Sequence, residues 1–205
     1  MATAAYACGM VMRTLLCGSI LIGSMVALSA LPAHAADPAS IWRNLSWFEG
    51  FWTGREQGLP GNGQGQRCYA PIMDRRFFYS RSETRFPPQT RNPDGENHAE
   101  WQIFSRDHDG GRVLLRRFGS GGQVTGFVLD PEASRSDRYV FVSTAFDQAP
   151  ADAHGRLTLT ITGGDGFRER LELGPSPDEL RQVMEGRWRR VAHESTGCAP
   201  EAMEP

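Results

Sequence analysis

The feature that most constrains this fold is a succession of short β-type runs separated by glycine, proline, asparagine and aspartate. Ten such runs follow one another, mostly at intervals of about ten to fifteen residues. The runs are 51–57, 66–73, 77–85, 98–106, 112–118, 124–129, 138–146, 156–162, 167–173 and 180–191. Many short strands joined by tight turns are typical of an antiparallel sandwich or barrel.

Side chains along several runs alternate between apolar and polar, as expected of strands with one buried face. Leu157, Leu159 and Ile161 alternate with threonines, and the run 167–173 alternates in the same way. No internal repeat or low-complexity linker divides the runs. The sequence therefore predicts an all-β fold, a single antiparallel up-and-down β-barrel of about ten strands with a short N-terminal helix.

Residues 1–35 are typical of a secretory signal peptide. They carry one charge, Arg13, then an apolar run over 15–31 and an Ala-x-Ala ending at Ala35. The apolar run is interrupted by glycines and serines and is too short for a membrane-spanning helix. We expect cleavage after Ala35, a periplasmic or secreted bacterial protein, and no stable membrane insertion after cleavage.

The rest of the chain divides into three parts. Residues 36–47 are amphipathic and predict a helical lead-in, 48–193 form the barrel domain, and 194–205 are a polar tail. The segment 178–191 is ambiguous, because a capping box and helical spacing of its apolar residues favour a helix. Gly186 disfavours a helix by about 1 kcal/mol, and a barrel needs a closing strand. We interpret the segment as a strand, with a helix as the alternative.

Two cysteines, Cys68 and Cys198, lie beyond the predicted signal peptide. In an oxidising compartment an even pair favours a disulfide. A bridge between them would tie the polar tail to an early strand, whereas two free thiols are the alternative.

The distribution of charged residues argues against a nucleic-acid partner. Every basic residue is arginine, and beyond residue 35 there are 21 arginines against 24 acidic residues, a net charge of −3. The arginines are interleaved with carboxylates, whereas nucleic-acid binders usually show a clustered basic face. We therefore expect no nucleic-acid partner.

A Gly-x-Trp sequence opens the first run, and a Trp-Arg pair lies on the last. This pattern resembles the signature of the calycins, the lipocalins and fatty-acid-binding proteins. In those folds the tryptophan closes one end of the barrel and an arginine of the final strand packs over its ring as a cation–π contact. The resemblance implies a barrel-closing set of Gly50, Trp52, Arg187, Trp188 and Arg189, with Arg190 as a further candidate for the covering arginine.

The chain from about residue 44 to 191 also resembles a bacterial family of unknown function related in fold to nitrobindin-type haem-binding barrels. Those barrels hold haem through one histidine near the end of the barrel chain. The resemblance makes His193 the candidate haem ligand, although its flanking sequence does not match the haem pattern. His108 and His154 have the sequence context of turns, and no spacing here is that of a zinc or calcium site. We expect no cofactor or metal, with haem as an alternative.

Candidate cavity residues come from the third and fourth runs. Tyr79, Arg81 and Glu83 share one face of a strand, and Glu100 and Trp101 lie on the next. An arginine–glutamate pair inside a barrel could orient a polar ligand, but such a face is more often solvated. The sequence predicts no catalytic residue, since Phe118 breaks the nucleophile-elbow pattern around Ser120. The glycine-rich stretch 58–65 precedes a strand, not a helix, and is interpreted as a long hairpin loop.

These features favour an exported barrel that binds a small, mostly apolar or amphipathic molecule in its interior. Two alternatives stay open: a haem protein or enzyme using the same cavity, and a structural envelope protein with a filled core.

Overall fold

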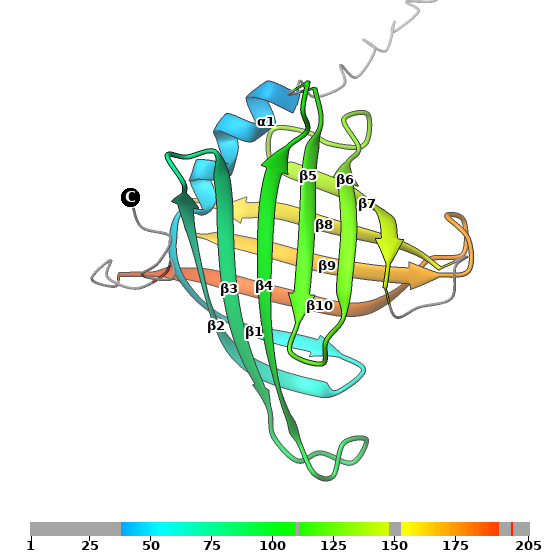
Figure 1. Ribbon diagram of the computed structural model, residues 1–205. Coiled ribbons are helices and arrows are strands. Elements are labelled where there is room, and N and C mark those ends of the chain that lie inside the picture. Colours follow the sequence, from blue (N-terminus) through cyan, green and yellow to red (C-terminus); the bar gives the residue numbers. More distant parts are fainter. Residues whose placement is uncertain (1–37, 110, 148–152, 193–197, 199–205) are drawn as a thin grey trace, which may run out of the picture. The chain divides into compact units, whose positions relative to one another are not determined.

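The computed structural model describes residues 38–109, 111–147, 153–192 and 198. Within these ranges, ten strands form a closed antiparallel barrel in which each strand pairs with the next and the last pairs with the first (Figure 1). A helix, α1 (Pro38–Asn44), and a 3₁₀ turn, η1 (Leu45–Phe48), precede them. The strands are β1 (Gly50–Gly58), β2 (Gly61–Ile72), β3 (Phe77–Phe86), β4 (Glu96–Arg106), β5 (Val113–Gly119), β6 (Val124–Leu129), β7 (Arg138–Phe146), β8 (His154–Gly163), β9 (Gly166–Gly174) and β10 (Arg181–Val191). The predicted fold class is confirmed.

The prediction for the glycine-rich stretch is wrong. β2 begins at Gly61, and a two-residue turn joins it to β1, so most of the expected loop is strand. The inward positions Gly63 and Gly65 lie against aromatic rings from other strands. A Cβ at Gly63 would come within 2.8 Å of the Phe86 ring, and one at Gly65 within 3.1 Å of the Trp188 ring. The glycines therefore make room for large side chains inside the barrel.

The ambiguous last segment is a strand, as interpreted. Residues 176–179 form a turn in which the Glu179 amide donates to the Ser176 carbonyl. The register of β10 against β9 shifts between Gln182 and Met184. This bulge explains the helical spacing in the sequence, because neighbouring Val183 and Met184 both face the same cavity.

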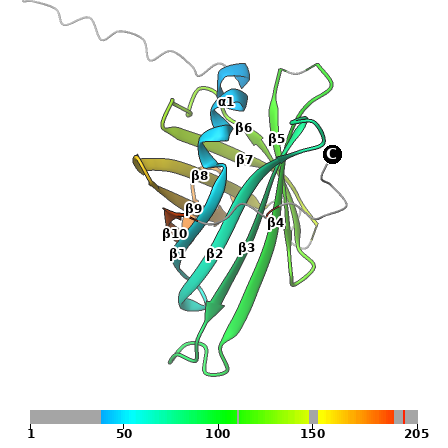
Figure 2. The same cartoon turned by 90° about the vertical axis from the view of Figure 1, so that its left-hand side faces the viewer.

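One end of the barrel is closed by the helical segment. Ile41, Leu45 and Phe48 are buried in the same apolar cluster as Trp52 and Phe167. Figures 1 and 2 show α1 at this end, away from the β3–β4 hairpin at the other. In an up-and-down barrel, every second turn lies at the same end. The end opposite α1 carries the turns of the hairpins β1–β2, β3–β4, β5–β6, β7–β8 and β9–β10. Among the described residues, no helix covers this end.

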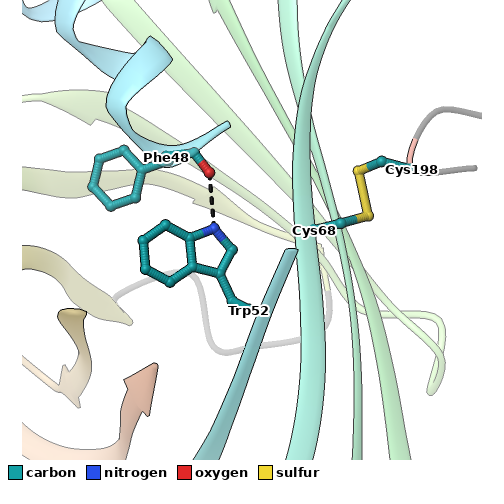
Figure 3. Close-up of a disulfide and its surroundings, with 4 residues drawn as sticks. All are labelled: Phe48, Trp52, Cys68 and Cys198. Atoms are coloured by element: carbon teal, nitrogen blue, oxygen red, sulfur yellow. Dashed lines mark hydrogen bonds between the residues drawn. A yellow bond between two sulfur atoms is a disulfide. The ribbon is translucent and has the colours of Figure 1, made fainter. Parts of the chain in front are cut away.

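Trp52 forms the contacts of a barrel-closing residue. Its indole nitrogen donates to the Phe48 carbonyl at 2.8 Å (Figure 3), and its ring meets Phe167 edge-on at 4.7 Å. The guanidinium above it belongs to Arg190, which also donates to the carbonyls of Trp47 and Glu49.

Two of the implied closing residues lie elsewhere. Arg187 and Arg189 are exposed on the outer face, because alternation along β10 turns Trp188 and Arg190 inward instead. Trp188 is buried, but deeper in the barrel than Trp52, opposite Gly54. The choice of Arg187 and Arg189 as closing residues was therefore wrong.

Cys68 and Cys198 form a disulfide with a Cα–Cα distance of 5.7 Å (Figure 3), as the sequence predicts. Cys68 points to the outer face of β2, since its neighbours Arg67 and Tyr69 point inward. The bridge thus fixes Cys198 to the outside of the barrel wall. Among the described residues, no helix has the length and apolar character needed to cross a membrane.

Candidate ligand-binding cavity

The open end of the barrel contains a cavity of about 730 Å³. Its mouth is formed by the turns after β1 and β5 and by the first residues of β4, and its walls are inward side chains from most of the strands. The described interior has two parts: an apolar core beneath the helical end, and this cavity at the opposite end. Between them lies a layer of buried charged side chains.

One wall of the cavity is apolar. It is formed by Phe127, Phe146, Leu171, Leu173, Val183 and Met184. Several of these are only partly buried, so the wall exposes apolar surface inside the barrel. The facing wall is polar, with Ser82, Thr84, His98 and Glu100 from β3 and β4. The cavity therefore suits a molecule with an apolar side and a polar side.

Arg67 is the centre of the charged layer. Its side chain is 1% exposed, it donates through Nη1 to Glu169 Oε2, and its Nη2 lies 3.6 Å from Glu56 Oε1. The same guanidinium lies 4.5 Å from the centroid of the Trp188 ring. Burial opposes its charge, but Glu169, Tyr69 and Glu56 outweigh this effect and raise the pKa of Arg67. The group is held permanently charged.

A second ion pair extends the layer toward β5. Arg117 Nη2 donates to Glu100 Oε2, and the Gln102 amide links the two pairs by donating to Glu100 at 2.8 Å and to Glu169 at 3.2 Å. Burial opposes ionisation of Glu100, but Arg117 and then Arg67 outweigh it and lower the pKa of this carboxyl. Glu100 is therefore a carboxylate at neutral pH.

Glu56 differs from the other two carboxyls. It is 5% exposed and lines the cavity. Burial raises its pKa; Arg67 opposes this rise, and Glu169 and Glu100 add to it. Burial also raises the pKa of Tyr69, which accepts a hydrogen bond from Arg67 Nη1 at 3.3 Å, to about 12, so its phenol stays neutral. Of these three carboxyls, Glu56 is therefore the one whose ionised form is disfavoured by its buried environment.

Three glycines allow Trp188 to lie flat beneath Arg67. A Cβ at Gly54 would come within 2.6 Å of the Trp188 ring, one at Gly65 within 3.1 Å, and one at Gly186 within 2.6 Å of its nitrogen. Residues with side chains would displace the indole, and with it the guanidinium above. The glycines of β1, β2 and β10 therefore position the charged layer.

The predicted cavity residues fall on both sides of the wall. Glu100 lies inside and lines the cavity, whereas Arg81, Glu83 and Trp101 are exposed on the outer face. Tyr79 is buried but also points outward, where its ring meets Trp101 edge-on at 5.9 Å. Tyr79, Arg81 and Glu83 do share one face of β3, but it is the outer face of the barrel and not the cavity face. The inward residues are Ser80, Ser82 and Thr84.

The histidines that the structure describes form no cluster. His193 lies outside the described residues, so its role as a haem ligand stays a prediction. His98 lines the mouth of the cavity, where its Nε2 is 2.9 Å from Glu96 Oε2, and His108 is exposed in a turn. No group of three or more histidine, cysteine or carboxylate side chains among the described residues could hold a metal ion.

Sequence reasoning missed four residues of the charged layer: Glu56, Arg67, Arg117 and Glu169. Three carried a signal. Glu169 shares an otherwise apolar strand face with Phe167 and Leu171, and Glu56 shares a strand face with Trp52. Arg117 follows Val113 and Leu115 on one strand face. Arg67 lies between Gln66 and Cys68, and no pattern there distinguishes it from an exposed residue.

A second hollow of about 870 Å³ lies along the outside of the β1–β2 hairpin. Most of its lining is exposed and polar, including Arg55, Gln57, Arg85 and Arg187. Such a surface stays hydrated and removes little of a ligand from water. The interior cavity is the better candidate site.

Comparisons with known proteins identify the fold. No protein-family model and no curated protein sequence matches this chain. The crystal structure of Rv2717c from M. tuberculosis matches with a TM-score of 0.52 and 16% identity, covering 73% of this chain and 96% of that one. This chain is similar to it in fold.

Two designed barrels also align. A de novo fluorescence-activating β-barrel has a TM-score of 0.37 and 13% identity, over 71% of this chain and 95% of its own. The structure of EF1p2_mFAP2b bound to DFHBI has a TM-score of 0.37 and 12% identity, over 73% and 98%.

Proposed function

We propose that this protein is an exported, calycin-like binding barrel that holds one small amphipathic molecule in the cavity at its open end. The observation that supports this most is the division of the interior. The helical end is packed with aromatic and aliphatic side chains, whereas the other end leaves about 730 Å³ unfilled above a charged layer. Ligand sites typically occupy about 300–1,000 Å³ and combine apolar walls with a few polar groups.

Unpaired polar atoms support an occupant with a polar end. Within the described residues, the cavity-lining residues Arg67 and Arg117 each have an Nε that is buried without a hydrogen-bond partner. Buried polar groups are usually paired, so unpaired ones at a cavity indicate a ligand or bound water. A filled structural core, the alternative, would not leave apolar wall residues partly exposed inside the barrel.

Export is part of the proposal. The signal-like segment 1–35 lies outside the described residues, and the Cys68–Cys198 disulfide is the supporting observation, because disulfides persist mainly in oxidising compartments. N-terminal mass analysis of the protein from the bacterial periplasm should find Ala36 as the first residue. An intact segment 15–31 would contradict export by cleavage.

A dye titration tests the cavity. N-phenyl-1-naphthylamine is small, apolar and neutral, and we expect a saturable, one-to-one rise in its fluorescence. Leu171→Trp places a large ring in the cavity and should weaken binding tenfold or more. Glu172→Trp, on the outer face of the same strand, is the matched control and should bind as the parent does. No saturable binding, or equal binding by both variants, would contradict the proposal.

A further inference from the structure

The charged layer contains one carboxyl more than it has guanidinium groups. Three glutamates, Glu56, Glu100 and Glu169, face two arginines, Arg67 and Arg117, and four of the five are less than 10% exposed. Their contacts with one another put them in one electrostatic group. Taken together, the ionised layer has a charge of −1, and it lies between the apolar core and the cavity.

The hydrogen bonds show which carboxyl is the extra one. Glu169 accepts from Arg67 and Gln102, and Glu100 accepts from Arg117 and Gln102. Glu56 approaches Arg67 only at 3.6 Å, beyond the range of a good hydrogen bond, and Arg67 is already bound to Glu169. Glu56 is therefore the weakly matched charge.

Glu56 also has the right position to meet a ligand. Its position on β1 is opposite Gly186 on β10 and Gly63 on β2, so no side chain stands at either paired position. Glu56 lines the same cavity as the apolar wall residues Leu171 and Met184. A molecule with its apolar part on that wall can bring a polar end to this carboxyl.

We infer that the ligand is an apolar amine, and that its ammonium group pairs with Glu56. This deepens the proposed function and rests on it. A buried carboxylate without a matched cation is costly, and a ligand cation supplies the missing charge. A carboxylate ligand would instead add negative charge to a layer whose arginines are already paired. The unpaired Nε groups of both arginines need only an acceptor such as a hydroxyl oxygen.

The titration behaviour of Glu56 agrees with this geometry. Burial raises its pKa, Arg67 on β2 opposes the rise, Glu169 on β9 and Glu100 on β4 add to it, and the Thr84 hydroxyl on β3 slightly lowers it. From β10 the paired residue is Gly186, which has no charge. An ammonium placed beside Glu56 favours its ionised form, so amine binding should release protons and strengthen as the pH rises through the pKa of Glu56.

Three probes of equal chain length test the inference: 1-octylamine, 1-octanol and octanoate, each titrated calorimetrically into the full protein. We expect octylamine to bind at least tenfold more tightly than octanol, and octanoate to bind most weakly. Octylamine titrations in buffers of different ionisation enthalpy should show proton release. Octanol that binds as tightly as octylamine, or a preference for octanoate, would overturn the inference while leaving the cavity proposal standing. No binding by any probe would contradict both.

Variants identify the residue. Glu56→Gln keeps the size of the side chain and should reduce octylamine affinity at least tenfold while octanol affinity stays within about twofold. Glu56→Asp retains the charge and should keep part of the amine preference. Glu83→Gln, an exposed glutamate on the outer face, is the matched control and should change neither. Equal losses for octylamine and octanol in Glu56→Gln would overturn the assigned role, because they would show that Glu56 shapes the cavity without pairing with charge.

Discussion

The Arg190 guanidinium lies 4.2 Å from the centroid of the Trp52 ring, joining the last strand of the barrel to the first. Trp52 is 1% exposed and lies among Phe48, Trp47 and Phe167. The same arginine donates to the carbonyls of Trp47 and Glu49, which lie at the junction of helix and barrel. The pair therefore connects the three elements that close this end.

Trp52→Ala should lower the free energy of unfolding by about 3–5 kcal/mol, the usual cost of truncating a large buried aromatic residue. Arg190→Ala should cost less, about 1–3 kcal/mol, for the lost cation–π contact and charged hydrogen bonds. Residues in contact couple, so the double variant should lose less than the sum. Arg189→Ala, exposed on the same strand, is the control. Urea unfolding measures all four, and a Trp52→Ala variant as stable as the parent would contradict the closing role.

The disulfide joins residues 130 positions apart. A loop of this length should stabilise the fold by about 4–5 kcal/mol in the chain-entropy model, and often by less in practice. Reductant should therefore lower the unfolding midpoint of the parent and leave that of Cys68→Ser/Cys198→Ser unchanged. Two thiols that react with Ellman's reagent in the unfolded, unreduced parent would show that the bridge is absent.

Glu56 and Glu100 should affect stability with opposite pH dependence. The pKa of Glu56 is raised in the folded state by burial, so the folded protein holds this proton more tightly than the unfolded chain and loses stability as the pH rises above the ordinary value of 4.5. Glu56→Gln removes this loss. Its stability relative to the parent should increase from about pH 4.5 toward neutral pH.

Glu100 behaves in the opposite sense, because burial is outweighed by Arg117, Arg67 and the hydrogen bonds from Gln102 and Arg117 together, which lower its pKa. Its contribution is present above the ordinary carboxyl value and is lost as the pH falls. Glu100→Gln leaves Arg117 without its partner and should destabilise by about 3–5 kcal/mol at neutral pH, with a smaller effect in acid. Urea unfolding of both variants between pH 3.5 and 7.5 should give opposite slopes, and parallel slopes would contradict the charge assignments.

The glycine positions around Trp188 are also testable. Gly54→Ala places a Cβ 2.5 Å from the Arg187 carbonyl and 2.6 Å from the Trp188 ring, so the indole or the strand must shift. We expect a loss of about 1–3 kcal/mol, typical of overpacking. Gly164→Ala, in the β8–β9 turn with no atom within 4 Å, is the control and should change stability little. Equal effects would show that Gly54 does not position the indole.

Periodicity predicted the barrel but not the contents of its interior. The alternation of Leu157, Leu159 and Ile161 identified a half-buried strand, because burial of one face selects apolar residues at every second position. On β3 the same reasoning predicted that the face with Tyr79, Arg81 and Glu83 points into the barrel, which is wrong. Tyr79 is buried from outside, and the inward residues Ser82 and Thr84 are polar because they line the cavity rather than the apolar core.

The charged layer could be predicted only in part, because its partners come from strands far apart in the sequence. Glu169 and Arg67 form an ion pair although they are 102 positions apart in the sequence. No local sequence pattern indicates a contact between residues so far apart. The bulge at Val183 has a similar explanation, since it depends on the register against β9. Closure by Arg190, not Arg187 or Arg189, follows from alternation once Trp188 is known to point inward.

Native mass spectrometry of the protein isolated from the bacterial periplasm tests the central claim, that the open end of the barrel holds one small molecule. We expect a native mass that exceeds the sequence mass by one ligand, which is released on denaturation. Leu171→Trp should lose this excess, whereas Glu172→Trp should keep it. The bare sequence mass in the native parent, or the same excess in Leu171→Trp, would contradict the claim.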